Sequence, residues 1–254
     1  MTRDTQKPTA FRPALWGIMG LALYMAAPLA SAQDHLPPGI KVIYIRPPAY
    51  VDKVPGNTTY SDADIDAATE LAKLGDAEAE ANLGVMLTTR SKYAEAALWY
   101  RRAADFGIAT AAYNLGTLYY NGQGFPQDYA KAQQWFEQAA KRNDPYAEFQ
   151  LGMMYGNGKG VDVDPAAELR WYSKAAAQGL PAAQYNLAVM YHNAEGVTQD
   201  DVKAYAWLLL AQRGGVDVAE AKSVITDGMT EEQMRSAEVL SRSLYVATDA
   251  YTRQ

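Results

Sequence analysis

Cysteine is absent from this 254-residue chain, and histidine occurs only as His35 and His192. Without cysteine there is no disulfide framework, no thiolate nucleophile and no zinc site with cysteine ligands. Two histidines offer little material for a histidine metal site or a catalytic triad. We therefore expect a protein that is not an enzyme, binds no metal and uses no cofactor.

The first 32 residues have the three parts of a secretory signal peptide. Basic residues precede an apolar run over residues 14–27, and small residues at 30–32 follow it. Cleavage after Ala32 would leave Gln33 as the new N-terminus. The alternative is an uncleaved anchor, but the run is shorter than the roughly 20 residues of a bilayer-spanning helix, so we expect no membrane insertion of the mature chain. The basic residues are Arg3, Lys7 and Arg12.

The chain is acidic, and removal of residues 1–32 makes it more so. That segment holds three basic residues and one acidic residue, which leaves 20 basic and 28 acidic side chains and a formal net charge of −8. An acidic surface repels phosphate backbones. Nucleic acid is therefore not an expected partner.

Residues 33–60 are rich in proline, which excludes a helix and favours extended backbone. Between two proline pairs lies Ile40-Lys41-Val42-Ile43-Tyr44-Ile45, a candidate short strand. This strand could dock on a partner, or the whole segment could lie as an extended arm on its own domain. We favour the arm.

Tryptophan recurs every 36 residues from position 99 onward, and other residue types keep the same interval. A fixed period of this length is the signature of stacked repeats. The tryptophans are Trp99, Trp135, Trp171 and Trp207. Other columns in register are Ala103, Ala139, Ala175 and Ala211; Gly107, Asn143, Gly179 and Gly215; Leu115, Leu151 and Leu187; and Tyr119, Tyr155 and Tyr191.

Each unit has the pattern of two helices joined by a glycine-rich turn. In the third unit, apolar residues at helical spacing predict a first helix over 145–155, and Gly156-Asn157-Gly158-Lys159-Gly160 ends it. Asp164 is a predicted N-cap with Pro165 at the first helical position, and the second helix ends near Gly179. Asp128 and Asp200 repeat the cap.

Small residues in the first helices predict a close approach of the two helices of each pair. They are Gly116, Gly152 and Ala188. The repeated tryptophans are more often core side chains than a ligand-stacking surface, and we expect Trp135 and Trp171 to pack in the core.

These columns resemble the Sel1-like repeats, relatives of the tetratricopeptide repeats. The motifs Ala-x-x-x-Leu-Gly, Tyr-x-x-Gly-x-Gly and Ala-x-x-Trp-Tyr-x-x-Ala-Ala-x-x-Gly stand here at 147–152, 155–160 and 168–179, with Glu168 in place of the leading alanine. The resemblance covers about residues 61–215. It implies an all-α fold, a right-handed α-solenoid of helix-turn-helix repeats, at about 76–107, 108–143, 144–179 and 180–215. The first unit has a connection four residues shorter.

The two ends of the 61–254 domain are predicted to be caps. Residues 62–75 resemble the second helix of a degenerate earlier unit, and residues 216–226 begin a fifth first helix within the C-terminal capping helices 216–254. Thr230 and Gln233 form a predicted capping box at the start of a final helix. Caps of this kind shield the ends of a solenoid from water.

Sites of other chemistry find little support. The glycines at 156–160 recur at Gly122, Gly124 and Gly196, between two helices, which favours a structural turn over a phosphate loop. Asp162 and Asp164 lack the set of spaced oxygen ligands that calcium needs. For His192 the sequence offers no evident serine or carboxylate partner, and a surface position is expected.

One polar column suggests binding. Asparagine or glutamine precedes the small residue in each first helix, and in tetratricopeptide-like stacks the first helices line the concave face. A ladder of amides there could pair with the backbone of an extended peptide; alternatively, the amides bridge neighbouring helices inside the stack. The amides are Asn82, Asn114, Gln150 and Asn186, with Tyr113, Phe149 and Tyr185 beside them.

The resemblance and the export signal together imply a non-enzymatic scaffold or regulator that binds a protein or peptide on its concave face. The expected location is the periplasm of a Gram-negative bacterium, and the expected partner is an envelope protein. The alternatives are a protein that binds or processes cell wall or polysaccharide, and an assembly subunit of an envelope or exopolysaccharide secretion complex.

Overall fold

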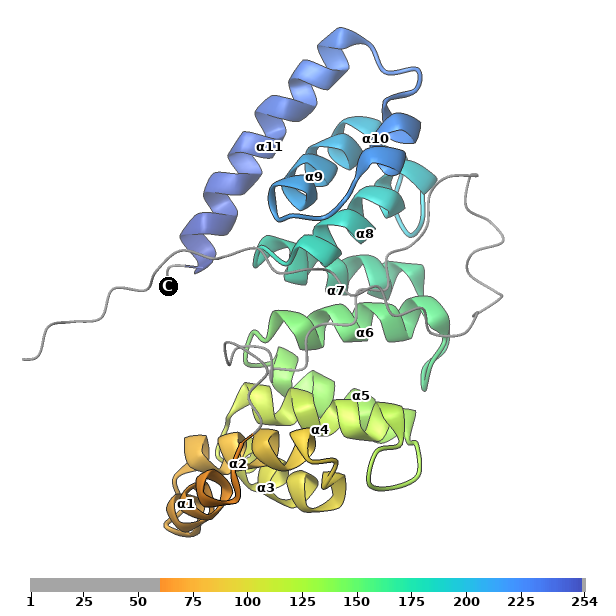
Figure 1. Ribbon diagram of the computed structural model, residues 1–254. Helices are drawn as coiled ribbons and strands as arrows, with labels where there is room; N and C mark the ends of the chain where they lie inside the picture. The colour runs from red at the N-terminus through yellow and green to blue at the C-terminus, as the bar shows by residue number, and fades with distance from the viewer. Residues whose placement is uncertain (1–59, 253–254) are drawn as a thin grey trace, which may run out of the picture.

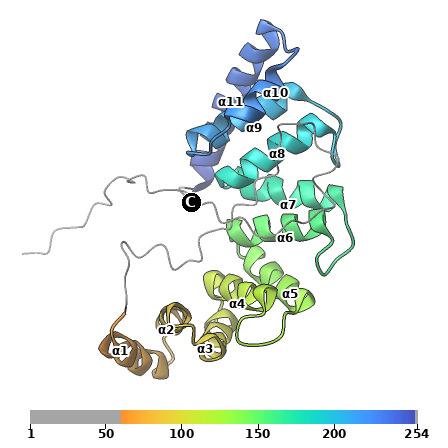
Figure 2. The same ribbon diagram turned by 45° about the vertical axis from the view of Figure 1, so that its right-hand side comes forward.

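The computed structural model describes residues 60–252, and over this range the chain forms eleven helices and no strand. The predicted signal peptide and the candidate strand at 40–45 lie outside the described residues. Figures 1 and 2 show the helices following one another along a curved arc, with α1 at one end and α11 at the other. The predicted all-α solenoid is confirmed.

Four helix pairs form the body of the arc, flanked by one helix before them and two after them. The first pair is joined by three residues, 90–92, whereas each later pair is joined by seven. The helices are α1 (Asp62–Lys73), α2 (Ala77–Thr89), α3 (Tyr93–Asp105), α4 (Ala109–Asn121), α5 (Tyr129–Ala140), α6 (Pro145–Asn157), α7 (Pro165–Ala177), α8 (Pro181–Asn193), α9 (Asp201–Arg213), α10 (Ala219–Thr226) and α11 (Glu231–Thr252).

The predicted N-caps of the second helices are confirmed. The side chains of Asp128, Asp164 and Asp200 each accept hydrogen bonds from backbone N–H groups in the first turn of α5, α7 and α9, at 2.9–3.0 Å. These bonds satisfy donors that have no partner within the helix. Asp144 caps α6 in the same way, with a 2.8 Å bond from the Ala147 N–H.

Left-handed backbone ends the second helices where the sequence placed glycine or asparagine. Asn143 has φ 58°, and Gly179 has φ 86°, a conformation that these residue types adopt most readily. The turn between the helices of a pair also contacts the preceding repeat. A Cβ on Gly160 would lie 2.7 Å from the Cβ of Tyr129, at the start of α5, so glycine lets this turn pack on its neighbour.

The core of each of the first three repeats is an aromatic side chain packed on a glycine. Tyr100 and Tyr172 are 1% exposed and Phe136 is fully buried, and they face the small residues of the paired first helices. The close helix approach predicted at Gly116 and Gly152 is confirmed by distances below 3 Å from a would-be Cβ to these rings.

The tryptophan column is less buried than expected. All four tryptophans are only partly buried and pack against the edge of the core clusters. The reason is the turn of about 100° between successive helical residues, which points the next residue into the core and leaves tryptophan at the boundary. The four are Trp99, Trp135, Trp171 and Trp207.

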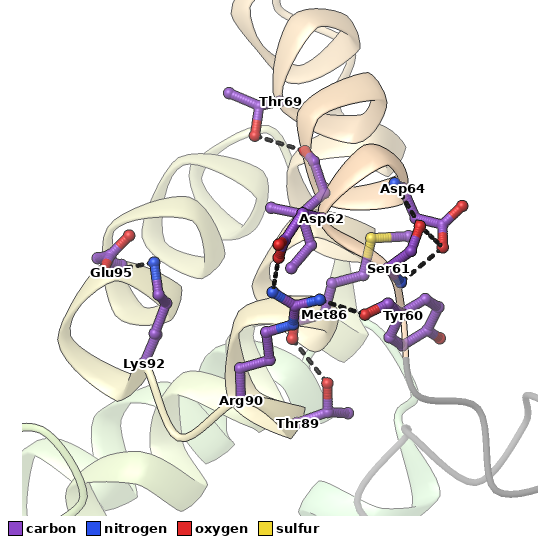
Figure 3. Close-up of polar contacts among 11 residues, drawn as sticks. Tyr60, Ser61, Asp62, Asp64, Thr69, Met86, Thr89, Arg90, Lys92 and Glu95 are labelled. Atoms are coloured by element: carbon purple, nitrogen blue, oxygen red, sulfur yellow. Dashed lines mark hydrogen bonds and ion pairs between the residues drawn. The ribbon is translucent and has the colours of Figure 1, made fainter.

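At the N-terminal end, Arg90 ties α1 to α2 (Figure 3). Its guanidinium contacts the carboxylate of Asp62 and the backbone carbonyl of Tyr60. Ser61 and Asp64 form a capping box at the start of α1, in which Ser61 N–H donates to the Asp64 carboxylate at 2.7 Å. These bonds fix the start of α1 against the end of α2.

At the C-terminal end, α11 lies along α9 and touches α7. The predicted capping box is confirmed, because Thr230 N–H donates to the Gln233 side chain at 2.8 Å and Gln233 N–H donates to the Thr230 hydroxyl. Ala237 is fully buried and shares a core cluster with residues of α9. The helix α11 therefore covers the outer side of the last repeat.

Candidate interaction surfaces

The predicted ladder of amides is mostly inside the stack. Asn114, Gln150 and Asn186 are 7%, 8% and 2% exposed, and the neighbouring Tyr113 and Tyr185 are equally buried. Asn82 alone among the four amides is exposed. The predicted contact of these residues with a partner stays a prediction. It assumed that the amides are exposed, and three of the four are buried.

The contacts of Asn114 explain why this column is polar. Its side chain hydrogen-bonds the hydroxyl of buried Tyr100, which joins α4 to α3. The amide thus satisfies a phenol that burial has removed from water, and the resulting desolvation raises the pKa of Tyr100. Asn186, two repeats later, has no hydrogen-bond partner among the described residues. Bridging within the stack, the second alternative from the sequence, accounts for Asn114.

Exposed apolar side chains gather instead on the outer face of α3. Leu98 and Phe106 are 65% and 68% exposed, and Trp99 lies partly exposed beside them. An open hollow of about 390 Å³ is lined by Leu98, Trp99, Arg101 and Arg102. Large exposed apolar residues that cluster in this way mark a candidate interaction site. We call the group Leu98, Trp99, Arg101, Arg102 and Phe106 the α3 outer face.

Two arginines lie on the α3 outer face, and within the described part of the chain only one of them forms an ion pair. Arg102 pairs at 2.5 Å with Glu80, a fully buried carboxylate of α2, and stacks on the Trp99 ring at 4.9 Å. Arg101 donates to the Tyr119 hydroxyl at 3.0 Å and has no carboxylate within 4 Å among the described residues. Arg101 therefore has no ion-pair partner at contact distance among the described residues, and the exposed Asp105 stands one turn later on the same helix.

Comparison between repeats shows that the fold does not require this apolar surface. The residues 36 positions after Leu98 and Phe106 are the exposed Gln134 and Arg142, and those a further repeat on are Arg170 and Gln178. The difference between Leu98 and Phe106 and their polar equivalents is visible in the sequence. The repeat pattern does not reveal it, because that pattern consists of the residues that all repeats share.

The structure brings the carboxyl groups of Glu168 and Glu195 into a partly buried site near the turn after α8. Glu168 takes the place of an alanine that is fully buried in the other three repeats, and Gly156 makes room for it. Burial, and then the charge of Glu195, raise the pKa of Glu168 to about 8. Burial also raises the pKa of Glu148, on α6, to about 7, although a 2.7 Å bond from Gln178 opposes the shift.

His192 has the carboxylate partner that the sequence did not reveal. Its Nδ1 lies 2.7 Å from Oδ1 of Asp201, the first residue of α9, and the imidazole is largely buried rather than on the surface. The two residues are nine positions apart, across a turn, so helical spacing gave no hint of the contact. Among the described residues no group of three or more His, Asp or Glu side chains is arranged to hold a metal ion.

None of the described helices has both the length and the apolar character that a bilayer crossing requires.

Stacked pairs of helices that repeat every 36 residues define the protein as an α-solenoid of helix-turn-helix repeats. A family model described as Sel1 repeat matches residues 77–105, 109–144, 145–180 and 181–215, and the chain belongs to the Sel1 repeat family. Sel1 repeats are generally protein–protein interaction modules, and their family is typically one of non-enzymatic scaffolds.

Two solved structures are similar to this chain. One is c5321, a protective antigen present in uropathogenic Escherichia coli strains and displaying an SLR fold; it is 31% identical over 75% of this chain, with a TM-score of 0.67. The match covers 42% of c5321, so this chain spans less than half of its length. The other is a Sel1 repeat protein from Oxalobacter formigenes, 29% identical over 76% of this chain and 83% of its own, with a TM-score of 0.62. A comparison with curated proteins found no match.

Proposed function

We propose that this protein is an exported, non-enzymatic scaffold of the bacterial cell envelope that binds a partner protein on the α3 outer face. The observation that carries the proposal is the exposure of Leu98 and Phe106 beside Arg101, which has no ion-pair partner within 4 Å among the described residues. Exposed aromatic, leucine and arginine side chains around a hollow have the composition of a binding hot spot. The export signal at residues 1–32 supports the envelope location.

A second candidate is an assembly subunit of an envelope complex. Apolar residues are exposed at both ends of the arc, including Leu74 on the N-terminal side and Val246 on α11, at 83% and 68%. A subunit held between two neighbours would cover such surfaces in the assembly. A cell-wall or polysaccharide binder has less support, because titratable groups do not converge on the described hollow.

A cross-linking pull-down from envelope extract of the source organism tests the proposal. The wild-type bait is residues 33–254, and the variant bait carries Leu98→Gln and Phe106→Arg, side chains similar to those of the next repeats. A third bait with Asn82→Ala tests the exposed amide of the first helices. Loss of one captured protein with the double variant alone supports the α3 outer face. Loss with Asn82→Ala alone would return the site to the first helices.

Capture of glycan fragments without protein would favour the cell-wall alternative. Capture of several proteins that depends on Leu74 or Val246, and not on Leu98 or Phe106, would favour the assembly subunit. Capture of nothing by any bait would contradict the scaffold itself.

A further inference from the structure

The last repeat shows what an apolar outer face is for in this fold. At the positions that correspond to Leu98, Arg101 and Arg102, helix α9 has Ala206, Leu209 and Leu210. Ala206 and Leu210 are buried and Leu209 is partly buried, because α11 lies over this side of α9. In the described part of the chain, the outer face of α9 is thus covered by a helix.

The contact between α11 and α9 is that of an amphipathic helix on an apolar stripe. Ala237 is fully buried, and Met234, Leu240 and Leu244 pack against the same cluster as Leu209. Polar contacts lie at its edge, where Arg213 of α9 sits 3.9 Å from the centre of the Tyr245 ring. A repeat of this solenoid therefore accepts a helix on its outer side.

The α3 outer face has the same position in the first repeat and no helix over it among the described residues. Leu98 and Phe106 are eight residues apart, about two helical turns, and point to the outside of the same helix. The intermediate repeats have glutamine and arginine at these positions and need no cover. Among the described repeats, two helices thus have apolar residues on the outer face. On α9 this face is covered by α11, and on α3 no described helix covers it.

We infer that the α3 outer face binds an amphipathic helix of a partner protein, with acidic residues flanking the apolar stripe. The inference rests on the proposed function and adds the kind of partner. Two leucine-sized or aromatic side chains about two turns apart would pack on Leu98 and Phe106, with Trp99 at the side of the stripe next to Leu98. A carboxylate at the edge of the stripe would pair with Arg101, which has no ion-pair partner within 4 Å among the described residues.

A photo-crosslinking amino acid at position 98 tests the inference in the full chain, expressed in its source organism. The matched control carries the same amino acid at Gln134, the exposed equivalent one repeat later. The expected result is a cross-link from position 98, absent from position 134, to a segment of another protein that has apolar residues at helical spacing and acidic neighbours. Cross-links to a second copy of this chain, to lipid or to a segment without helical spacing would overturn the inference, as would their absence.

A synthetic peptide of the cross-linked segment completes the test. On addition of the protein its circular dichroism should gain helical signal, and Arg101→Glu or Phe106→Arg should weaken binding by about tenfold or more. Both substitutions are on the surface, and an unchanged melting temperature of each variant controls for folding. Binding that is unaffected by both variants would overturn the inference.

These outcomes separate the inference from the proposed function. If the pull-down captures a protein equally well with wild-type and α3-variant baits, the scaffold stands and the helix site on α3 fails. If no bait captures any protein, both fail.

Discussion

Gly152 of α6 lies directly against the ring of Tyr172 of α7, so that a Cβ on Gly152 would be 2.7 Å from two ring carbons. The same contact joins Gly84 to Tyr100 and Gly116 to Phe136. In the fourth repeat the corresponding residues are Ala188 and Leu208, both buried in one cluster. Glycine faces an aromatic ring and alanine faces leucine, so the sizes of the two residues are matched.

We expect Gly152→Ala to destabilise the protein by about 1–3 kcal/mol, because the added methyl group would force the buried Tyr172 ring to move. Tyr172→Leu alone should also destabilise, through a cavity. The double variant reproduces the alanine–leucine pair of the fourth repeat. Urea unfolding of all four proteins should show that it loses less than the sum of the single variants by at least about 1 kcal/mol. Additive losses would mean that the two residues are not coupled.

The raised pKa values of Glu148 and Glu168 predict a stability that falls as the pH rises. The folded protein binds these protons more tightly than the unfolded chain, in which a glutamate titrates near its model value of 4.5. The contribution is fully present below that pH and is lost as the pH rises through about 7 for Glu148 and about 8 for Glu168. Both carboxylates become charged in surroundings that solvate them poorly.

Glu168→Gln should therefore raise the free energy of unfolding at pH 9 by about 1–3 kcal/mol relative to wild type and change it little at pH 4.5. Urea unfolding at intervals of one pH unit measures the difference. Glu78→Gln removes the same charge from an exposed position of α2 and is the matched control. A Glu168→Gln effect that does not grow with pH, or that Glu78→Gln reproduces, would contradict a burial cost.

Removal of residues 230–254 should make the protein self-associate, because α11 covers the apolar outer side of α9. Size-exclusion chromatography with light scattering should show a higher mass than for the full chain, together with a lower melting temperature. Val239→Lys with Val246→Lys places charges on the exposed side of α11 and should preserve the melting temperature. A truncated chain with unchanged mass and stability would show that the cover is dispensable.

The segment 1–32 should be absent from the mature protein. Expression in a Gram-negative host followed by fractionation should place the protein in the periplasm, and N-terminal sequencing should begin at Gln33. An intact Met1 in the membrane fraction would support the uncleaved anchor.

The features that recur every 36 residues could be predicted from the sequence, because repetition amplifies a weak local signal. The caps at Asp128 and Asp164 and the close approach at Gly152 are local or nearly local contacts, and each repeat tests them again. The amide column was ambiguous for a different reason. A first helix packs against second helices on both sides, so a polar residue such as Asn114 can be buried without breaking the helical pattern.

The α3 outer face could not be found from a helical pattern alone. Helical spacing places Leu98 on the side of α3 away from the buried Tyr100, but only the packed structure shows that no described helix lies over it. The pair His192 and Asp201 was missed because a seven-residue turn sets its geometry.

The turns of the later repeats lock each repeat onto the one before it. Gly124 packs on the start of α3, Gly160 on the start of α5 and Gly196 on the start of α7, each so closely that a side chain would not fit. Each of these contacts fixes the position of one repeat relative to the repeat before it. The stack of repeats consequently sets the distance and the orientation between α3 and α11. A partner bound at α3 is held at that distance and orientation from a partner bound at α11, and the insertion of one repeat would change both.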